Sequence, residues 1–189
     1  MYDRSSATFF CGSKIKIIRL NYSLAQRDEE QPAMQKITPF LWFDNNAEEA
    51  MNFYTSIFKS SKIGQVSRYG DAGPGPKGSV MVGTFYLEGQ EFMALNGGPN
   101  FKFTPATSFM VNCETQNEID YYWNALSAGG KPNRCGWLDD KFGLSWQIVP
   151  TMLGELMGKG EPEKSNRMMQ ALMKMDKLII ADLRRAYEG

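Results

Sequence analysis

Histidine is absent from the 189-residue sequence, and cysteine is scarce. The lack of histidine removes the usual general base near neutral pH and the commonest ligand of transition metals. The three cysteines, Cys11, Cys113 and Cys135, are odd in number and far apart, which argues against both a disulfide framework and a CxxC metal pair. We therefore expect a cytoplasmic protein in which any catalysis proceeds without imidazole.

The sequence also has no block of like charge and no long apolar run. Its 21 basic and 21 acidic residues balance, so no electrostatic footprint for nucleic acid is predicted. No apolar stretch reaches the roughly 18 to 20 residues that span a bilayer, and the N-terminus lacks a secretory signal pattern. Neither nucleic acid nor membrane is an expected partner.

A repeated pattern of strands and one helix fills residues 34–150. Residues 37–43 are apolar, β-branched and aromatic, as in a buried strand, and 44–46 supply helix N-cap candidates. An amphipathic helix is predicted over 47–58, with Glu48 and Glu49 in its first turn. Three further strands follow from alternating patterns at residues 63–69, 79–88 and 91–96.

The same order then begins again. Residues 106–113 predict a strand and 116–128 a helix, which Gly129 and Gly130 terminate. Residues 131–139 and 144–150 supply more strands. The expected fold class is α+β, with two βαβββ modules at residues 34–100 and 101–150.

Two segments flank the modules. Residues 1–33 are interpreted as a loosely attached extension with a short strand at 14–20. Residues 151–189 are predicted to be helical, and their apolar positions require cover by their own module or by a second copy of the chain. The apolar positions of this tail are Met152, Leu153, Leu156 and Met157, and then Met168, Leu172, Met175, Ile179 and Leu183.

Several stretches resemble one family, the PhnB-like or 3-demethylubiquinone-9 3-methyltransferase-like proteins of the vicinal oxygen chelate (glyoxalase/bleomycin resistance/dioxygenase) superfamily. The resemblance covers about residues 36–183 in unbroken order. It implies two modules curled into a half-open β-barrel around a cavity, often completed by a second subunit in a homodimer. The stretches are ITPFLWFDNNAEEAMNFYTSIF, SRYGDAGPGPKGSV, GQEFMALNGGP, CGWLDDKFGLSWQIVP and MMQALMKMDKL.

Metal-dependent members of the superfamily carry histidine or glutamate at four positions on the strands. The resemblance places these positions at Pro39, near Ala106, at Gln147 and near residues 94–96. None of the first three carries a good cation ligand, because proline and alanine have no donor atom and a neutral amide binds cations weakly. We therefore expect neither a metal nor another cofactor.

Eight residues are candidates for binding a ligand. Trp42, Phe101 and Trp137 would line an aromatic cavity, although core packing alone accounts for most such side chains. Polar residues are candidates where they are expected at the cavity mouth or on an inner strand face. The alternatives are that they belong to an ordinary turn, face solvent or, for the cysteine, form a buried structural thiol. The polar candidates are Asn96, Asn100, Ser108, Cys135 and Gln147.

The favoured function is binding of a small, hydrophobic or aromatic molecule without a catalytic metal. The alternative is an enzyme, either a methyltransferase as the family is labelled or a lyase, isomerase or dioxygenase of the superfamily. A Rossmann-like methyltransferase would show a strand, a glycine-rich turn, a helix and an acidic residue after the next strand, and the sequence has no such pattern. Whether the protein turns over a substrate stays open.

Overall fold

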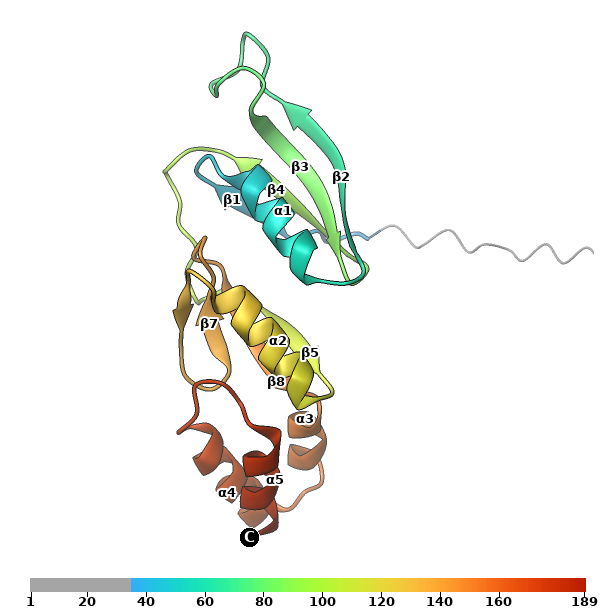
Figure 1. Ribbon diagram of the computed structural model, residues 1–189, viewed down its shortest axis with the longest axis vertical. Helices are drawn as coiled ribbons and strands as arrows, with labels where there is room; N and C mark the ends of the chain where they lie inside the picture. Colours follow the sequence, from blue (N-terminus) through green and yellow to red (C-terminus); the bar gives the residue numbers. More distant parts are fainter. Residues whose placement is uncertain (1–34) are drawn as a thin grey trace, which may run out of the picture. The chain divides into compact units, whose positions relative to one another are not determined.

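The computed structural model describes residues 35–189, which form two βαβββ modules followed by three helices (Figure 1). The predicted extension 1–33, with its strand at 14–20, lies outside these residues. The first module, here the N-module, has the sheet order β1-β4-β3-β2, in which the β1–β4 pair is parallel and the others are antiparallel. Its elements are β1 (Phe40–Phe43), α1 (Ala47–Ile57), β2 (Ser61–Arg68), β3 (Val80–Leu87) and β4 (Gln90–Asn96).

The second module, the C-module, repeats this topology with the order β5-β8-β7-β6. Here β5 and β8 form the parallel pair. Within residues 35–189 no ladder joins the two four-stranded sheets, so each sheet stays unclosed. Its elements are β5 (Ser108–Cys113), α2 (Gln116–Ser127), β6 (Lys131–Pro132), β7 (Trp137–Asp139) and β8 (Ser145–Pro150).

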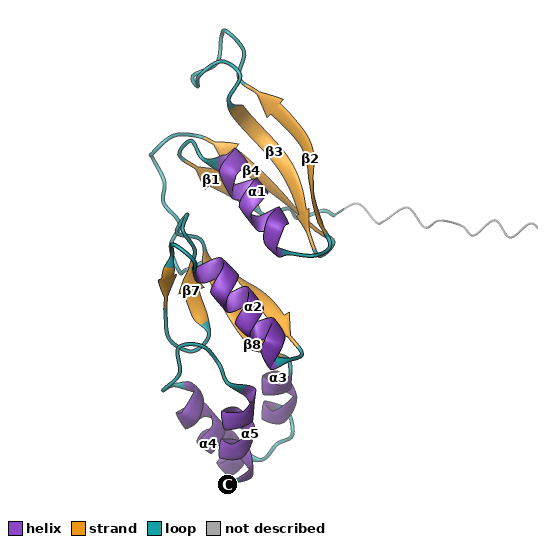
Figure 2. Ribbon diagram, in the orientation of Figure 1, coloured by secondary structure: helices purple, strands orange, loops and turns teal. Residues whose placement is uncertain are grey.

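Each sheet has one face covered by its own helix and one open face (Figure 2). Side chains alternate between these faces along the strands, and the buried positions of β3, β4 and β8 lie on the helix side. Tyr54 of α1 stacks on Phe85 of β3, with ring centroids 6.0 Å apart. The predicted pairing of one amphipathic helix with each sheet is confirmed.

A buried carboxylate ties the modules together. Asp140, in the turn between β7 and β8, accepts hydrogen bonds from the Tyr54 hydroxyl at 2.7 Å and from Nε1 of Trp146 at 2.9 Å. The backbone N–H groups of Phe142 and Leu144 donate to its other oxygen. Removal from water nevertheless raises the pKa of Asp140, although these four hydrogen bonds oppose the shift.

The tail forms a small helical unit with its own core. It contains α3 (Met152–Met157), α4 (Pro162–Leu172) and α5 (Ile180–Glu188), whose inner faces share a buried cluster. The predicted apolar stripe is interrupted, because α4 ends at Leu172 and the chain continues without helix before α5. The cluster consists of Met152, Leu156, Met168, Leu172, Leu178, Leu183 and Tyr187.

The tail is fixed to the C-module through a turn in the CGW motif. Backbone N–H groups of Cys135 and Gly136 donate to the carbonyls of Met175 and Asp176, each at 2.7 Å. Both residues of the turn have positive φ, 64° and 83°. This turn also explains why the single strand predicted over 131–139 is split into β6 and β7.

The first strand begins three residues later than predicted. Ile37 is 86% exposed, and β1 starts only at Phe40. Pro39 has no N–H with which to enter the ladder, although its carbonyl accepts a hydrogen bond from Met93 at 2.9 Å. The apolar run alone did not show that the strand begins at Phe40.

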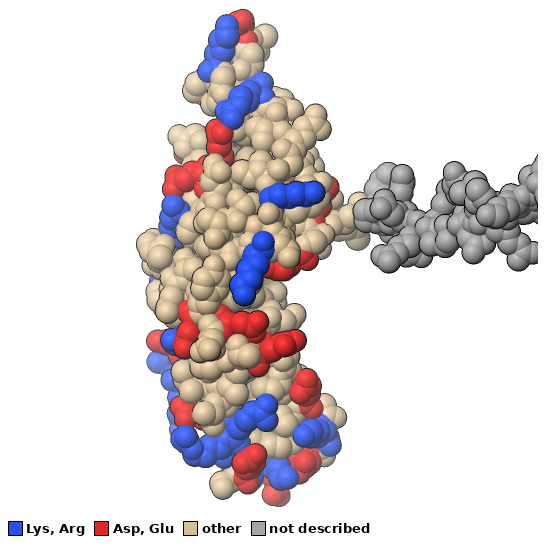
Figure 3. Space-filling view, turned by 45° about the vertical axis from the view of Figure 1, so that its right-hand side comes forward, with Lys and Arg blue, Asp and Glu red and all other residues tan. Residues whose placement is uncertain are grey.

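Charged residues of both signs are interspersed on the face that Figure 3 shows. Among residues 35–189, no helix combines the length and the apolar character that crossing a bilayer requires.

Candidate functional site

The open faces of the two sheets carry five of the eight predicted ligand-binding residues, either on a strand or packed against one. The N-module face presents Phe40 and Trp42 from β1 beside Met93 and Leu95 from β4, as the strand register shows. The C-module face presents alternate residues of β5 and β8, together with Trp137 of β7. The two faces differ in polarity, and each is described in turn.

A neutral hydrogen-bonded pair marks the C-module face. The amide nitrogen of Gln147 donates to the hydroxyl of Ser108 at 2.9 Å, so the two predicted residues share one face. Trp137 and Met110 pair with Gln147 on its two sides. Met110 is 55% exposed. The amide of Gln147 thus lies between an indole and a thioether on an accessible surface, with Ser108 beside it.

A second polar group lies one row along the same face. Asp139 accepts hydrogen bonds from the Ser145 hydroxyl at 2.5 Å and the Asn133 amide at 3.1 Å. Ser145 pairs with Ser108 across the β5–β8 ladder. The C-module face is therefore bordered by polar groups that are already hydrogen-bonded to one another.

Aromatic side chains dominate the N-module face. The ring of Trp42 meets Phe101 edge to face, with centroids 5.0 Å apart, and its Nε1–H donates to the carbonyl of Gly98 at 2.9 Å. Gly97 lies under the indole: a Cβ there would come within 2.2 Å of a ring carbon. Glycine at this position allows Trp42 to lie directly against the backbone.

A pocket of about 910 Å³ opens beside this tryptophan. It extends from Trp42 and Leu95 to the loop between β2 and β3, where Tyr69 donates to the carbonyl of Asn96 at 2.8 Å. Asp44 and Glu49 also line it. The pocket continues the N-module face at the end of its strands.

The remaining predicted residues have different surroundings. Asn96 is buried and structural contacts occupy its amide, which accepts from the N–H of Ala47 at 2.8 Å and donates to the carbonyl of Val80 at 2.9 Å. It thereby takes over the capping of α1, which no side chain of the preceding loop provides. Asn100 is exposed in a turn.

Cys135 lies apart from both open faces, in the turn that holds the tail. Its sulfur is 3.6 Å from Sδ of Met173, and its thiol is partly buried against the tail core. Cys113, by contrast, is buried at the end of β5, where desolvation raises its pKa to about 12. Neither thiol belongs to the polar pair of Ser108 and Gln147.

Carboxylates are few on the open faces of the strands that the structure describes. On the open faces of β1, β4, β5 and β8 the carboxylate is Glu91, which accepts hydrogen bonds from Tyr86 at 2.7 Å and from Thr38 at 3.5 Å. Gln147 supplies only a neutral amide to this surface. Within residues 35–189, no three His, Cys, Asp or Glu side chains converge to hold a metal.

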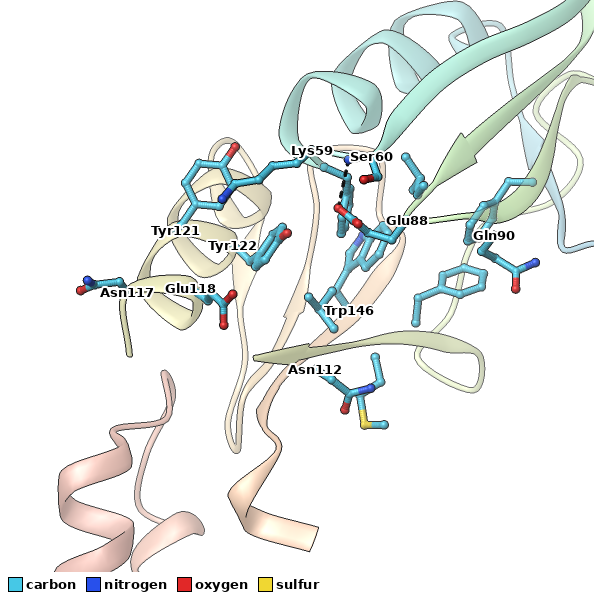
Figure 4. Close-up of a pocket in the computed structure, with 16 residues that line it drawn as sticks. Lys59, Ser60, Glu88, Gln90, Asn112, Asn117, Glu118, Tyr121, Tyr122 and Trp146 are labelled. Carbon is cyan, nitrogen blue, oxygen red and sulfur yellow. Dashed lines mark hydrogen bonds between the residues drawn. The ribbon is translucent and has the colours of Figure 1, made fainter. Parts of the chain in front are cut away.

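A second pocket, which the sequence did not predict, lies where the two modules meet (Figure 4). Its volume is about 920 Å³. Its residues come from the α1–β2 connection, the β3–β4 turn, β4, β5, α2 and β8. No local motif joins segments so far apart in sequence, so only the packing of the modules reveals the pocket.

Comparisons with known proteins agree with this architecture. The family model described as 3-demethylubiquinone-9 3-methyltransferase matches residues 35–149. The solved PhnB protein from Bacillus cereus is 47% identical, with a TM-score of 0.59 over 62% of this chain and 100% of its own. A solved Pseudomonas aeruginosa protein is 23% identical, with a TM-score of 0.52 over 61% of this chain and 97% of its own, and shares the fold.

No curated protein gives a significant match. The family match spans both modules and ends where the helical tail begins. The paired βαβββ modules and the 47% identity to PhnB agree with that match. The chain therefore belongs to the PhnB-like, 3-demethylubiquinone-9 3-methyltransferase family.

Proposed function

We propose that the protein binds a small, aromatic or apolar molecule on the open faces of its sheets, without a catalytic metal. The observation that carries the proposal is the hydrogen bond between Ser108 and Gln147, with Gln147 flanked by Trp137 and Met110. Aromatic surface with a few placed polar groups is typical of small-molecule sites. In this arrangement the amide and hydroxyl orient the ligand, and Trp42 and Phe101 supply stacking surface.

A homodimer is part of the proposal, because the open faces leave large apolar side chains in water. Phe40 is 53% exposed and Phe101 is 64% exposed. Exposed apolar surface of this kind is typical of an interaction site. A second copy of the chain would cover these side chains and enclose the ligand. Native mass spectrometry tests this directly, since the dimer has twice the 21.4 kDa mass of the chain.

The methyltransferase reading comes from the family's name. Each sheet has a single parallel pair, and no doubly wound parallel sheet with a crevice for S-adenosylmethionine is present in residues 35–189. No arrangement of residues in the described part of the chain favours methyl transfer over binding. The proposed function is therefore binding.

Calorimetric titration with 1-naphthol, a planar neutral aromatic with one hydroxyl, tests the proposal. The wild-type protein should bind it equally well with EDTA and with added Mn²⁺. Gln147→Leu should weaken binding about 2- to 10-fold, the value of one hydrogen bond. Gln170→Leu, at an exposed position of α4 away from both sheets, is the control and should bind as the wild type does. Binding that requires Mn²⁺, or equal affinity in Gln147→Leu, would contradict the proposal.

A further inference from the structure

The pocket between the modules has a floor that is separate from the open faces. Phe92, Phe109 and Trp146 form part of its lining, and these three point to the helix-covered sides of their sheets. Met110 and Asn112, on the open face of β5, lie at its edge, and its lining includes neither Ser108 nor Gln147. At about 920 Å³, its volume is in the range of small-molecule sites.

A continuous chain of aromatic rings forms this floor across the module boundary. Phe92 meets Phe109 at 5.1 Å between centroids, and Phe109 meets Trp146 at 5.6 Å. Trp146 meets Phe58 at 5.6 Å, and Phe58 stacks on Tyr122 at 5.2 Å. Such a surface suits a planar ring, and its faces also attract cations.

The rim adds one available negative charge. Glu88 is exposed in the β3–β4 turn, and the structure gives its carboxylate one partner, the N–H of Ser60 at a long 3.3 Å. Glu118, the other acid of the rim, accepts from the N–H groups of Glu114 and Thr115 as the cap of α2. Glu88 is therefore the less engaged of the two acids.

Glu88 acts on the aromatic floor from across the module boundary. Desolvation raises the pKa of Tyr122, and the charge of Glu88 is the next largest cause. Lys59 also lines the pocket, but no ion pair joins it to this carboxylate within residues 35–189. In Figure 4 the Lys59 side chain extends toward Tyr121. Aromatic rings and a free carboxylate thus lie together in one pocket.

We propose that this pocket is a second binding site, which takes a planar aromatic amine. The ring would lie on Phe58 and Tyr122, and the ammonium group would donate to the Glu88 carboxylate. Charge complementarity selects the amine over a carboxylate of the same shape. The proposal is independent of the ligand proposed for the open faces.

Tryptamine and indole-3-acetate form a matched pair of probes, because they share the ring and differ in the sign of the side-chain charge. We expect tryptamine to bind at least tenfold more tightly. Glu88→Gln should weaken tryptamine binding about 10- to 100-fold, as the loss of a charge-assisted hydrogen bond implies. Glu91→Gln is the control, because Glu91 lies on the open face of β4, away from the pocket-lining side of that strand. It should leave the affinity for tryptamine unchanged.

Side-chain NMR signals of the four tryptophans locate the bound probe. Trp146 lines this pocket, while Trp42 and Trp137 lie on the open faces. Tryptamine should shift the Trp146 signals. Shifts confined to Trp42 and Trp137, equal affinity for both probes, unchanged affinity in Glu88→Gln, or no binding at millimolar tryptamine would each overturn the proposal.

Discussion

The two modules share one topology but differ in what their open faces offer. Where β1 pairs with β4, the open face of the N-module is apolar, with Trp42 and Leu95 side by side. On the corresponding strands of the C-module it carries Ser108 and Gln147 in a hydrogen bond. The helix-covered faces of the two modules are thus alike in being apolar, whereas their open faces differ in polarity. In our proposal the aromatic side chains of the N-module stack on the ligand, and the amide and hydroxyl of the C-module orient it.

The largest expected effect comes from breaking the tie between the modules. Asp140→Ala would leave the buried Tyr54 hydroxyl and Trp146 N–H without an acceptor. We expect a loss of about 3–5 kcal/mol in the free energy of unfolding, since each unsatisfied buried group costs about 1–3 kcal/mol. Urea denaturation measures it, with the partly exposed neighbour Asp139→Ala as the control at a smaller loss. A loss below about 1 kcal/mol would show that the modules do not depend on this carboxylate.

The second prediction concerns the turn at which the tail is attached to the C-module. At Gly136 an added Cβ would lie 2.8 Å from the carbonyl oxygen of Ile148, and φ is +83°. Gly136→Ala should therefore reduce the free energy of unfolding by about 2–4 kcal/mol. Gly143 has φ +84° and open space where an added Cβ would lie. Gly143→Ala therefore measures the cost of the positive φ alone, about 1–2 kcal/mol of the free energy of unfolding. Equal losses in thermal unfolding would mean that the contact with Ile148 relaxes freely.

The third prediction sharpens the comparison on the N-module side. Asn96→Ala removes the acceptor for the N–H of Ala47 and the donor to the carbonyl of Val80. A loss of about 2 kcal/mol is expected from the missing helix cap and the buried carbonyl. The exposed Asn100→Ala should stay within about 0.5 kcal/mol of the wild type. If the two variants unfold alike, the cap contributes nothing.

The smallest effect is chemical and leaves stability untouched. With its pKa raised to about 12, the buried Cys113 stays a protonated thiol at pH 8. Because the thiolate is the reactive form, Cys113 should resist iodoacetamide while the partly exposed Cys135 is alkylated. Peptide mapping by mass spectrometry distinguishes the two sites. Labelling should spread to Cys113 only in denaturant, and rapid labelling of the native protein would contradict its burial.

Much of the fold could be predicted from the sequence, because periodicity records which face of an element is buried. The helix predicted at 47–58 and the structure's Ala47–Ile57 agree closely, and the two modules follow in the expected order. The split at Cys135 was missed because a positive φ at a non-glycine residue has no local signal. The interrupted tail was missed because apolar spacing continued through a segment that is not helical.

The site was predicted in part, and the reason lies in side-chain direction. Strand alternation suggested that Ser108 and Gln147 share a face, and the structure joins the two side chains by a hydrogen bond. Asn96 followed a strand in the same way, yet its position in the register directs it to the helix side, where it caps α1. The pocket around Glu88 and Tyr122 depends on contacts between modules, which a one-dimensional pattern does not contain.

The most direct test follows the tryptophan side-chain NMR signals of the whole chain during titration with 1-naphthol in EDTA. Trp42 and Trp137 lie on the open faces, whereas Trp123 is 7% exposed and Trp146 is 3% exposed in the core. If the ligand binds on the open faces, the signals of Trp42 and Trp137 should shift and saturate together. The signals of Trp123 should not change. Saturation without any change at these two indoles, or shifts that appear only when a divalent metal is added, would contradict metal-free binding at the open faces.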